Sequence, residues 1–340
     1  MANAAVKQTN TNYDLKEKVC ASKVFPSVFA AGELTIQRRI NRHPDCLQSN
    51  PAYKPDPTVL RRLLAWWNAP IQSMAFGLVG ETGTGKTEML LYVADMLNEP
   101  VYMVKCHPAL MPEDLEGSRT LVDGKTPFMP GPAAKAYMNG GLCIFDEVDK
   151  LSLMTQPALH GLVEGKPWPI ETIGRTIVKN PNCRIACTGN TTGEGGNEFY
   201  VTSQRMDDAL RSRIGWYRTN YPEAAVEMSI IGETFPNIPK AMVHAMVKLG
   251  NALRDARLGF DRKGVDNPIG CVFSTRTLFN WAFYTMAFGK EAIWRESLDF
   301  AMGGSVNPES QSEVDEIIQR HFDDLINQST ESVVKHYSLK

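Results

Sequence analysis

The sequence predicts an α/β fold in which a parallel sheet lies between helices, followed by a small all-helical lid-like domain. Three observations lead to this prediction. Short apolar segments of strand length alternate with helical patterns between residues 58 and 222. A glycine-rich loop separates the first of these strands from the helix that follows it. From residue 223 onward the apolar spacing is helical. Strands and helices that alternate in this way form parallel sheets that are covered on both faces.

Length and composition fit a globular protein with more than one domain. The chain has 340 residues, 43% of them apolar and 22% charged. We expect an irregular N-terminal arm over residues 1–57, the α/β domain over 58–222 and the helical domain over 223–340. No apolar run reaches the roughly 18 residues of a membrane span, and the N-terminus does not resemble a signal peptide. We therefore expect no membrane partner and a cytoplasmic location.

The individual elements follow from apolar spacing. Pro57 is expected to open the first helix, because apolar residues recur at helical intervals from Val59 to Trp67. The expected strands cover residues 74–79, 101–104, 142–145 and 184–188, with a helix over 89–97. In the helical domain we expect helices over 241–258, 274–288 and 314–326, the last of which should be the final long helix.

The glycine-rich loop matches the phosphate-binding motif G-x-x-x-x-G-K-[ST] at every position. Its residues are Gly80, Glu81, Thr82, Gly83, Thr84, Gly85, Lys86 and Thr87. Glycines let the backbone N–H groups turn toward phosphate oxygens, and the start of the next helix adds the positive end of its dipole. We expect Lys86 to reach the β- and γ-phosphates and Thr87 to place its hydroxyl on Mg²⁺. The loop therefore predicts binding of ATP and Mg²⁺.

Two carboxylates follow the strand over residues 142–145. An acid at the tip of a buried strand beside a phosphate loop can hold the magnesium shell, so Asp146 joins Thr87 as a candidate metal ligand. The next residue, Glu147, is the candidate general base, which would orient and deprotonate the attacking water. The pair predicts hydrolysis of ATP to ADP and phosphate.

Further candidates would complete the site. Asn190 ends the strand over residues 184–188, which we expect between the other two motif strands, so its amide would reach the γ-phosphate or the water. Either Arg213, our first choice, or Arg211 should project across a subunit boundary as an arginine finger. Arg276 lies in the first turn of a helix, where the dipole disfavours a cation, so we expect nucleotide phosphate as its partner.

These motifs, in this order over residues 58–300, resemble the AAA+ ATPases. The segments 113–117, 131–136 and 140–141 resemble the MoxR branch, which carries a β-hairpin insert in its second helix; residues 120–125 would form that hairpin around an Asp-Gly turn. The chain is most similar to the CobS-type ATPase subunit of cobaltochelatase in segments 50–53, 188–193 and 220–222. The loop segment Gly80-Glu81-Thr82-Gly83 differs from the Gly-Tyr-His-Gly of that type.

The resemblance implies a homo-oligomeric ring, usually a hexamer, with ATP bound between subunits. It also implies a partner protein with a von Willebrand A domain and a role in remodelling a client complex. Two other uses of the same motor stay open: the ATPase subunit of a metal chelatase, and a nucleic-acid-associated motor of a mobile element or phage. The net charge of −2 does not indicate a nucleic-acid partner.

Overall fold

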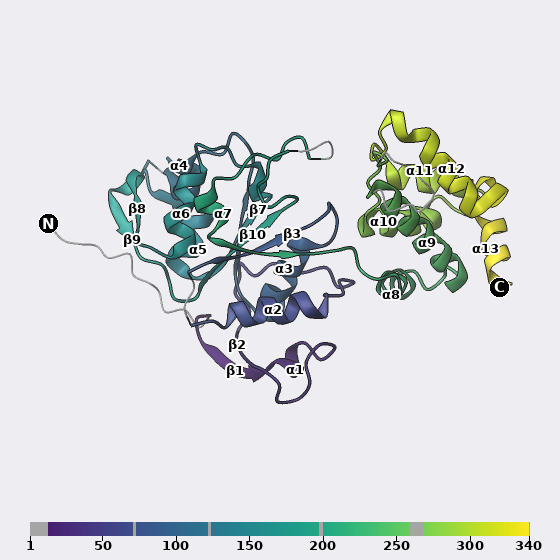
Figure 1. The fold of residues 1–340 in the computed structure, drawn as a ribbon. Coiled ribbons are helices and arrows are strands. Elements are labelled where there is room, and N and C mark those ends of the chain that lie inside the picture. Colours follow the sequence, from purple (N-terminus) through teal and green to yellow (C-terminus); the bar gives the residue numbers. More distant parts are fainter. Residues whose placement is uncertain (1–12, 71–72, 122–123, 197–199, 259–267, 340) are drawn as a thin grey trace. The chain divides into compact units, whose positions relative to one another are not determined.

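The computed structural model describes residues 13–70, 73–121, 124–196, 200–258 and 268–339. Its internal contacts divide the chain into two units (Figure 1). The first unit extends to Gly80 and continues over Gly85–Thr219. The second contains Asn220–Lys340 together with the loop tip Glu81–Thr84.

The first unit is built on a five-stranded parallel sheet with the strand order β11-β3-β10-β7-β4 (Figure 1). The strands are β3 (Ala75–Val79), β4 (Val101–Lys105), β7 (Gly141–Asp146), β10 (Cys183–Gly189) and β11 (Ile214–Arg218). β10 lies between β3 and β7, as predicted, so the phosphate loop, the acidic pair and Asn190 follow three neighbouring parallel strands. β11 is an additional strand that the sequence pattern did not indicate.

Helices bury both faces of this sheet. They are α2 (Pro57–Trp67), α3 (Lys86–Met96), α4 (Pro112–Glu116), α5 (Pro132–Asn139), α6 (Gln156–Glu164) and α7 (Asp208–Arg211). On β7, Leu142 and Ile144 belong to one apolar cluster with residues of α2 and α3. Cys143 and Phe145 belong to another with residues of α5 and α6. Alternate residues of one strand therefore enter two cores, which confirms the predicted α/β fold.

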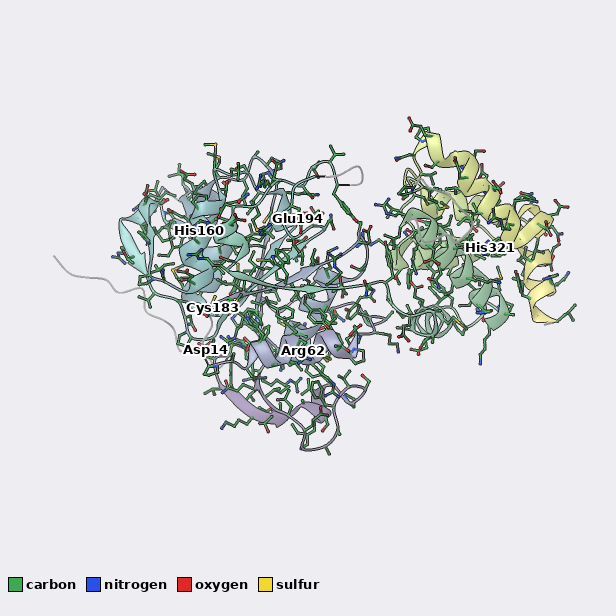
Figure 2. All side chains as sticks on the ribbon, in the orientation of Figure 1. Asp14, Arg62, His160, Cys183, Glu194 and His321 are labelled. Carbon is green, nitrogen blue, oxygen red and sulfur yellow. The ribbon has the colours of Figure 1, made fainter. Side chains whose placement is uncertain are left out.

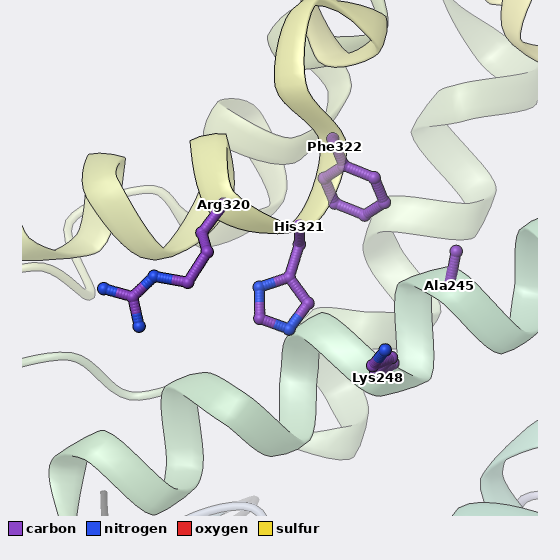
Figure 3. A pocket seen from close by; sticks show the side chains of 5 residues that line it. All are labelled: Ala245, Lys248, Arg320, His321 and Phe322. Atoms are coloured by element: carbon purple, nitrogen blue, oxygen red, sulfur yellow. The ribbon is translucent and has the colours of Figure 1, made fainter. Parts of the chain in front are cut away.

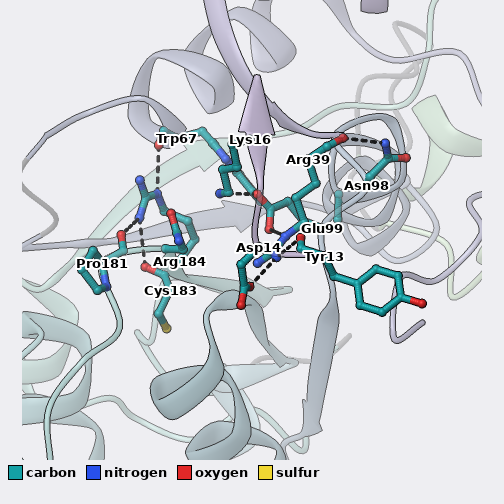
Figure 4. A network of polar contacts seen from close by, with 12 residues as sticks. Tyr13, Asp14, Lys16, Arg39, Trp67, Asn98, Glu99, Pro181, Cys183 and Arg184 are labelled. Atoms are coloured by element: carbon teal, nitrogen blue, oxygen red, sulfur yellow. Dashed lines mark hydrogen bonds and ion pairs between the residues drawn. The ribbon is translucent and has the colours of Figure 1, made fainter. Parts of the chain in front are cut away.

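The N-terminal region forms a short antiparallel hairpin of β1 (Lys16–Cys20) and β2 (Thr35–Arg39), joined through α1 (Ala21–Val24). Glu99, shortly after α3, anchors this hairpin (Figure 4). Its carboxylate accepts hydrogen bonds from Arg39 Nε at 2.6 Å and from Lys16 Nζ at 2.5 Å. The Arg39 and Glu99 side chains are almost fully buried, so this hairpin is tied to the end of the phosphate-loop helix.

Two further hairpins lie beyond the main sheet. β5 (Gly117–Arg119) pairs with β6 (Phe128–Pro130), so a hairpin is present, but its paired strands flank residues 120–125, which were predicted to form it. Its proposed turn includes Asp123, which lies outside the described residues. The second hairpin joins β8 (Trp168–Ile170) to β9 (Arg175–Ile177) through a 3₁₀ turn, η2 (Glu171–Ile173). The Glu116 carboxylate links the hairpins by accepting a hydrogen bond from Glu171 N at 3.0 Å.

The second unit is helical, as predicted. Its α-helices are α8 (Ala224–Thr234), α9 (Lys240–Arg257), α10 (Thr275–Ala287), α11 (Trp294–Met302), α12 (Gln311–Phe322) and α13 (Thr330–Ser338), with the 3₁₀ helices η3 (Pro308–Ser310) and η4 (Asp323–Asn327). Trp281 and Trp294 stack at 5.1 Å in its core. The helix expected over residues 314–326 stops at Phe322, because Asp323 has a φ of 47°. A shorter helix, α13, follows it and is capped by Ser329.

A pocket of about 280 Å³ lies between α9 and the end of α12 (Figure 3). It is lined by Ala245, Lys248, Arg320, His321 and Phe322. Arg320 and His321 occupy the last turn of α12, where cations complement the helix dipole. Arg320 is also paired with Glu316 at 2.9 Å. We therefore explain Arg320 and His321 by the electrostatics of the helix end and do not propose that they bind a ligand. None of the helices in the described part of the chain has the length and apolar character needed to cross a membrane.

Candidate nucleotide site

The phosphate loop connects β3 to α3, and its shape depends on glycine. Gly85 has a φ of 83° and precedes the first turn of α3, a backbone conformation that residues with a side chain rarely adopt. A Cβ at Gly80 would lie 2.2 Å from the carbonyl oxygen of Thr219, so a side chain would collide with backbone. The loop can therefore turn tightly and present its N–H groups at the start of a helix.

Lys86 joins the phosphate loop to Asn190. Its Nζ donates to the carbonyl oxygen of Gly80 at 2.8 Å and to Oδ1 of Asn190 at 3.1 Å. Lys86 is only 9% exposed, so its ammonium group is held at a defined position. The structure thus brings together the loop lysine and the amide that were predicted to act on the same phosphate.

Two hydroxyl groups converge on one oxygen of Asp146. Thr87 Oγ1 and Thr188 Oγ1 each donate to Asp146 Oδ1 at 2.7 Å. Thr188, on β10, was not predicted as a site residue, because only the neighbouring strands place its hydroxyl beside Asp146.

The oxygen atoms of Thr87 and Asp146 are suitable ligands for Mg²⁺. A hydroxyl and a carboxylate are hard oxygen ligands, and Mg²⁺ commonly takes only one or two from protein while keeping several waters. Among the residues that the structure describes, no group of three or more His, Cys, Asp or Glu side chains is arranged to hold a metal ion. The sparse pair Thr87 and Asp146 suits a metal that is also held by nucleotide phosphates.

Glu147 occupies an unusual backbone position. Its φ of 58° lies in the left-handed region, which non-glycine residues visit rarely and which is often found at functional sites. Its N–H donates to Thr188 Oγ1 at 3.0 Å. Its carboxylate accepts from Lys150 Nζ at 2.8 Å, and its side chain is 47% exposed. The sequence analysis missed Lys150, whose pairing with Glu147 depends on the turn between them.

Comparison with known proteins agrees with this geometry. Residues 76–214 match the family model described as "AAA domain (dynein-related subfamily)". The denitrification regulatory protein NirQ of Stutzerimonas stutzeri is 31% identical over 52% of this chain and 62% of its own length. NirQ of Pseudomonas aeruginosa is 30% identical over 52% of this chain and 66% of its own. Protein NorQ of Paracoccus denitrificans is 28% identical over 52% and 63%.

Residues 76–214 of this chain thus match an AAA domain, and the chain is similar to the MoxR-type proteins NirQ and NorQ. AAA+ domains generally bind nucleotides, and the sequence that matches the phosphate-binding motif forms the loop between β3 and α3. The chain spans slightly under two thirds of the length of these relatives. The similarity to the CobS type remains a prediction.

The two candidate fingers of this AAA+ protein lie at the end of α7. Arg213 Nε donates to Glu164 Oε1 at 2.6 Å, and its Nη1 donates to the carbonyl oxygen of Ala209 at 2.5 Å. Arg211 pairs with Asp208 at 3.0 Å and is more exposed, at 44% against 27%. Within the described residues neither arginine contacts the phosphate loop of its own chain.

Neighbouring side chains hold the segment that carries these arginines. Asp207 caps α7 by accepting from Leu210 N at 2.8 Å. His160 on α6, labelled in Figure 2, lies with Nε2 3.1 Å from Asp207 Oδ2. Hydrogen bonds from Lys166 and Arg213 hold the pKa of the Glu164 carboxyl below its ordinary value. Glu164 therefore stays ionised and can keep Arg213 in place at neutral pH.

In the second unit, Arg276 lies in the first turn of α10. It is exposed, and in the described part of this unit no hydrogen bond or ion pair holds its guanidinium. Ser274 caps the helix by accepting from Thr277 N at 3.1 Å. The role of Arg276 toward a nucleotide phosphate stays a prediction.

Two arginines near the end of α9 were not predicted. Arg254 is buried and donates to both oxygens of Glu227, at 2.8 and 2.7 Å. Arg257 Nε lies 3.3 Å from Oε2 of Glu81, a residue of the loop tip that belongs to the same unit. The sequence signal for both was weak, because cations in the last turn of a helix are common for electrostatic reasons alone.

Proposed function

We propose that this AAA+ protein hydrolyses ATP to ADP and phosphate with Mg²⁺ as cofactor. The observation that supports the proposal most strongly is the convergence on Asp146. Thr87 from the phosphate loop and Thr188 from the neighbouring strand donate to the same carboxylate oxygen. Lys86 meanwhile lies on the amide of Asn190. Three predicted motifs, distant in the sequence, therefore form one polar group at the carboxyl ends of β3, β7 and β10.

Each residue has a role in this proposal. Lys86 and the N–H groups of residues 80–87 hold the β- and γ-phosphates, while Thr87 and Asp146 hold Mg²⁺. The metal, when bound, supplies neutralisation of charge on the phosphate oxygens. Asn190 exchanges its contact with Lys86 for the γ-phosphate or the attacking water.

Glu147 accepts the proton of the attacking water. In the structure its carboxylate is paired with Lys150, so it must release this partner before it can act on water. Such a release costs little, because ion pairs that are partly exposed to solvent contribute only about 0–1 kcal/mol. A carboxylate that is close to the site and easily freed is suited to general-base catalysis.

The arginine-finger role requires more than one subunit. Arg213, with Arg211 as the alternative, would act on the nucleotide of a neighbouring copy in a ring, which we propose to be a hexamer. Arg276 would contact the nucleotide phosphate from the helical unit. A guanidinium that arrives from a neighbour stabilises the charge of the transition state and makes hydrolysis depend on assembly.

We further propose that hydrolysis drives remodelling of a partner complex through a protein with a von Willebrand A domain. The relatives from Stutzerimonas stutzeri and Pseudomonas aeruginosa are named denitrification regulatory proteins, which supports a regulatory use of the motor. In this reading the nucleotide-driven ring changes the state of another protein and does not itself transform a metabolite.

The test uses the full chain and its Glu147→Gln variant. Wild type should release phosphate from ATP in the presence of Mg²⁺ and lose this activity in EDTA. Glu147→Gln should bind ATP with similar affinity but hydrolyse it at least about a hundredfold more slowly, since a positioned general base contributes about 10²–10⁴ in rate. Absence of phosphate release by wild type, at protein concentrations where it oligomerises, would overturn the proposed hydrolysis.

The partner is tested with the same variant. Glu147→Gln should keep the ring loaded with ATP, and a tagged copy in its native host should retain a protein with a von Willebrand A domain. Lys86→Ala, which should lack nucleotide, is the matched control and should retain less of that protein. Equal recovery by both variants, or recovery of no such protein, would contradict the partner assignment.

A further inference from the structure

A buried carboxylate, Asp149, lies two positions after Glu147. It belongs to the 3₁₀ helix η1 (Val148–Lys150) and is 1% exposed. Its Oδ2 accepts hydrogen bonds from the backbone N–H groups of Asn190 and Thr191, both at 3.2 Å. The same oxygen accepts from the hydroxyls of Thr191 at 3.3 Å and Ser203 at 2.7 Å. One oxygen thus receives four donors.

The residues that donate to Asp149 belong to two segments, and each segment carries a different candidate residue of the nucleotide site. Asn190 and Thr191 form the turn after β10, which presents the Asn190 amide to Lys86. Ser203 lies shortly before α7, which carries the candidate arginine fingers. The carbonyl oxygen of Asp149 also accepts from Gln204 N, at 2.6 Å, so the second segment is held twice. Asp149 therefore connects the acidic segment, the Asn190 turn and the approach to α7.

The hydrogen bonds around the Asp149 carboxylate indicate that it positions the backbone of Asn190 and Thr191 more than it stabilises the fold. Within the described residues no lysine or arginine pairs with it, and its second oxygen, Oδ1, is buried without a hydrogen-bond partner. Removing a carboxylate from water is costly, and neutral donors on one oxygen offset that cost only in part. What the arrangement does achieve is a fixed backbone for two successive residues at the site.

We propose that Asp149 is a positioning residue for ATP hydrolysis that acts through Asn190. This inference rests on the proposed function. Because both N–H groups of the turn are held, the Asn190 side chain starts from a fixed Cα and can place its amide reproducibly, 3.1 Å from Lys86 Nζ in this structure. A displacement of about 1 Å at a reacting group can lower a rate by about a hundredfold, so a loosened turn should slow the chemical step.

The experiment is a double-mutant cycle between Asp149 and Asn190. Asp149→Ala should lower kcat by about tenfold or more while the KM for ATP changes less than about twofold, because the phosphate loop is intact. In an Asn190→Ala background, Asp149→Ala should have little further effect on kcat. Residues that act through one another give such non-additive effects. Hydrogen exchange at the amides of Asn190 and Thr191 should accelerate in Asp149→Ala alone.

A conservative variant and a matched control sharpen the test. Asp149→Asn keeps one acceptor oxygen for the four donors and should recover a large part of kcat. Asp56→Ala removes another carboxylate that accepts two backbone N–H groups, those of Thr58 and Val59, at the start of α2. This control should lower the thermal midpoint, leave kcat unchanged and combine additively with Asn190→Ala.

The outcomes separate this inference from the proposed function. Additive effects of Asp149→Ala and Asn190→Ala, in a wild type that hydrolyses ATP, would overturn the role of Asp149 alone. A raised KM with unchanged kcat would do the same. If wild type releases no phosphate, the proposed function fails first. Should Asp149→Ala not fold, Ser203→Ala removes the shortest bond to Oδ2, and its loss of kcat must likewise disappear in the Asn190→Ala background.

Discussion

The Nζ atom of Lys86 lies 3.1 Å from the amide oxygen of Asn190, although the two residues are 104 positions apart in the chain. The parallel pairing of β3 with β10 causes this contact, since both strands end at the same edge of the sheet. An ammonium group that rests on a neutral amide oxygen can exchange it for a phosphate oxygen at little cost, because the charged partner is the stronger acceptor. The contact therefore marks the place where a γ-phosphate would enter.

Replacement of this ammonium group should abolish nucleotide binding. Lys86→Ala removes a nearly buried cation that faces both the loop carbonyl of Gly80 and Asn190. We expect the dissociation constant for ATP, measured by calorimetry, to rise at least about a hundredfold, which corresponds to about 2.7 kcal/mol. Lys135→Ala, at an exposed position on α5, is the control and should bind ATP as wild type does. Retained affinity in Lys86→Ala would disprove the assignment of the loop.

Replacement of Arg213 and replacement of Arg211 should affect ATP hydrolysis differently. Arg213→Ala should still assemble and bind ATP but hydrolyse it poorly, by at least about tenfold in kcat, because a finger residue contributes mainly in the transition state. Arg211→Ala should hydrolyse normally. Sedimentation and nucleotide titration establish assembly and binding, and phosphate release measures turnover. The reverse result, with Arg211→Ala impaired and Arg213→Ala active, would exchange the two assignments.

The core of the fold and of the site was predictable because both depend on local patterns. The apolar runs of β3, β7 and β10 are nearly continuous, which is typical of strands buried on both faces. The phosphate loop, the acidic pair and Asn190 each follow one of those runs, and the parallel arrangement then places them together. Thus motif order and strand character were sufficient to place Lys86 near Asn190 and Thr87 near Asp146.

What the sequence did not reveal depends on tertiary placement. Asp149 meets Ser203, 54 positions away, only because the segment before α7 returns to the end of β10. Thr188 is a strand residue by pattern, and only its neighbours make its hydroxyl a partner of Asp146. The sequence pattern of the short polar strands β1 and β2 did not predict strands either. Their polar side chains are held by residues distant in the sequence, as Arg39 is by Glu99. The only feature of the sequence that pointed to Asp149 was its position two residues after Glu147.

Loss of the buried carboxylate at Glu99 should destabilise the protein strongly. Glu99→Ala leaves Arg39 and Lys16 without their shared acceptor in a buried position (Figure 4). Removing one partner of a buried pair typically costs about 3–5 kcal/mol, and we expect the lower end of this range here because Arg39 keeps its ion pair with Asp14 at 2.9 Å. Urea denaturation should show this loss, whereas Glu17→Ala, at an exposed position of β1, should change stability by no more than about 0.5 kcal/mol. A loss below about 1 kcal/mol in Glu99→Ala would mean that the hairpin is not anchored there.

Stability should fall in acid partly through Asp95, at the end of α3. Burial alone would raise the pKa of this carboxyl, but hydrogen bonds from Ser49 and Arg42 lower it below its ordinary value. Ser49 donates to Oδ2 through its N–H at 2.8 Å and its hydroxyl at 2.7 Å. Because the folded pKa is the lower one, the stabilisation is complete above the unfolded pKa of about 3.9 and is lost as the pH falls through the folded value.

Asp95→Asn isolates this contribution. The asparagine does not titrate, so the difference in unfolding free energy between wild type and variant should be largest near neutral pH and shrink as the pH falls below about 4. Chemical denaturation at a series of pH values measures it. The other carboxyls with lowered pKa values are present in both proteins and cancel; they include Glu33, Glu164, Glu194 and Asp207. A difference that stays constant from neutral pH to below about pH 3 would show that the bonds to Ser49 and Arg42 do not favour the ionised carboxylate.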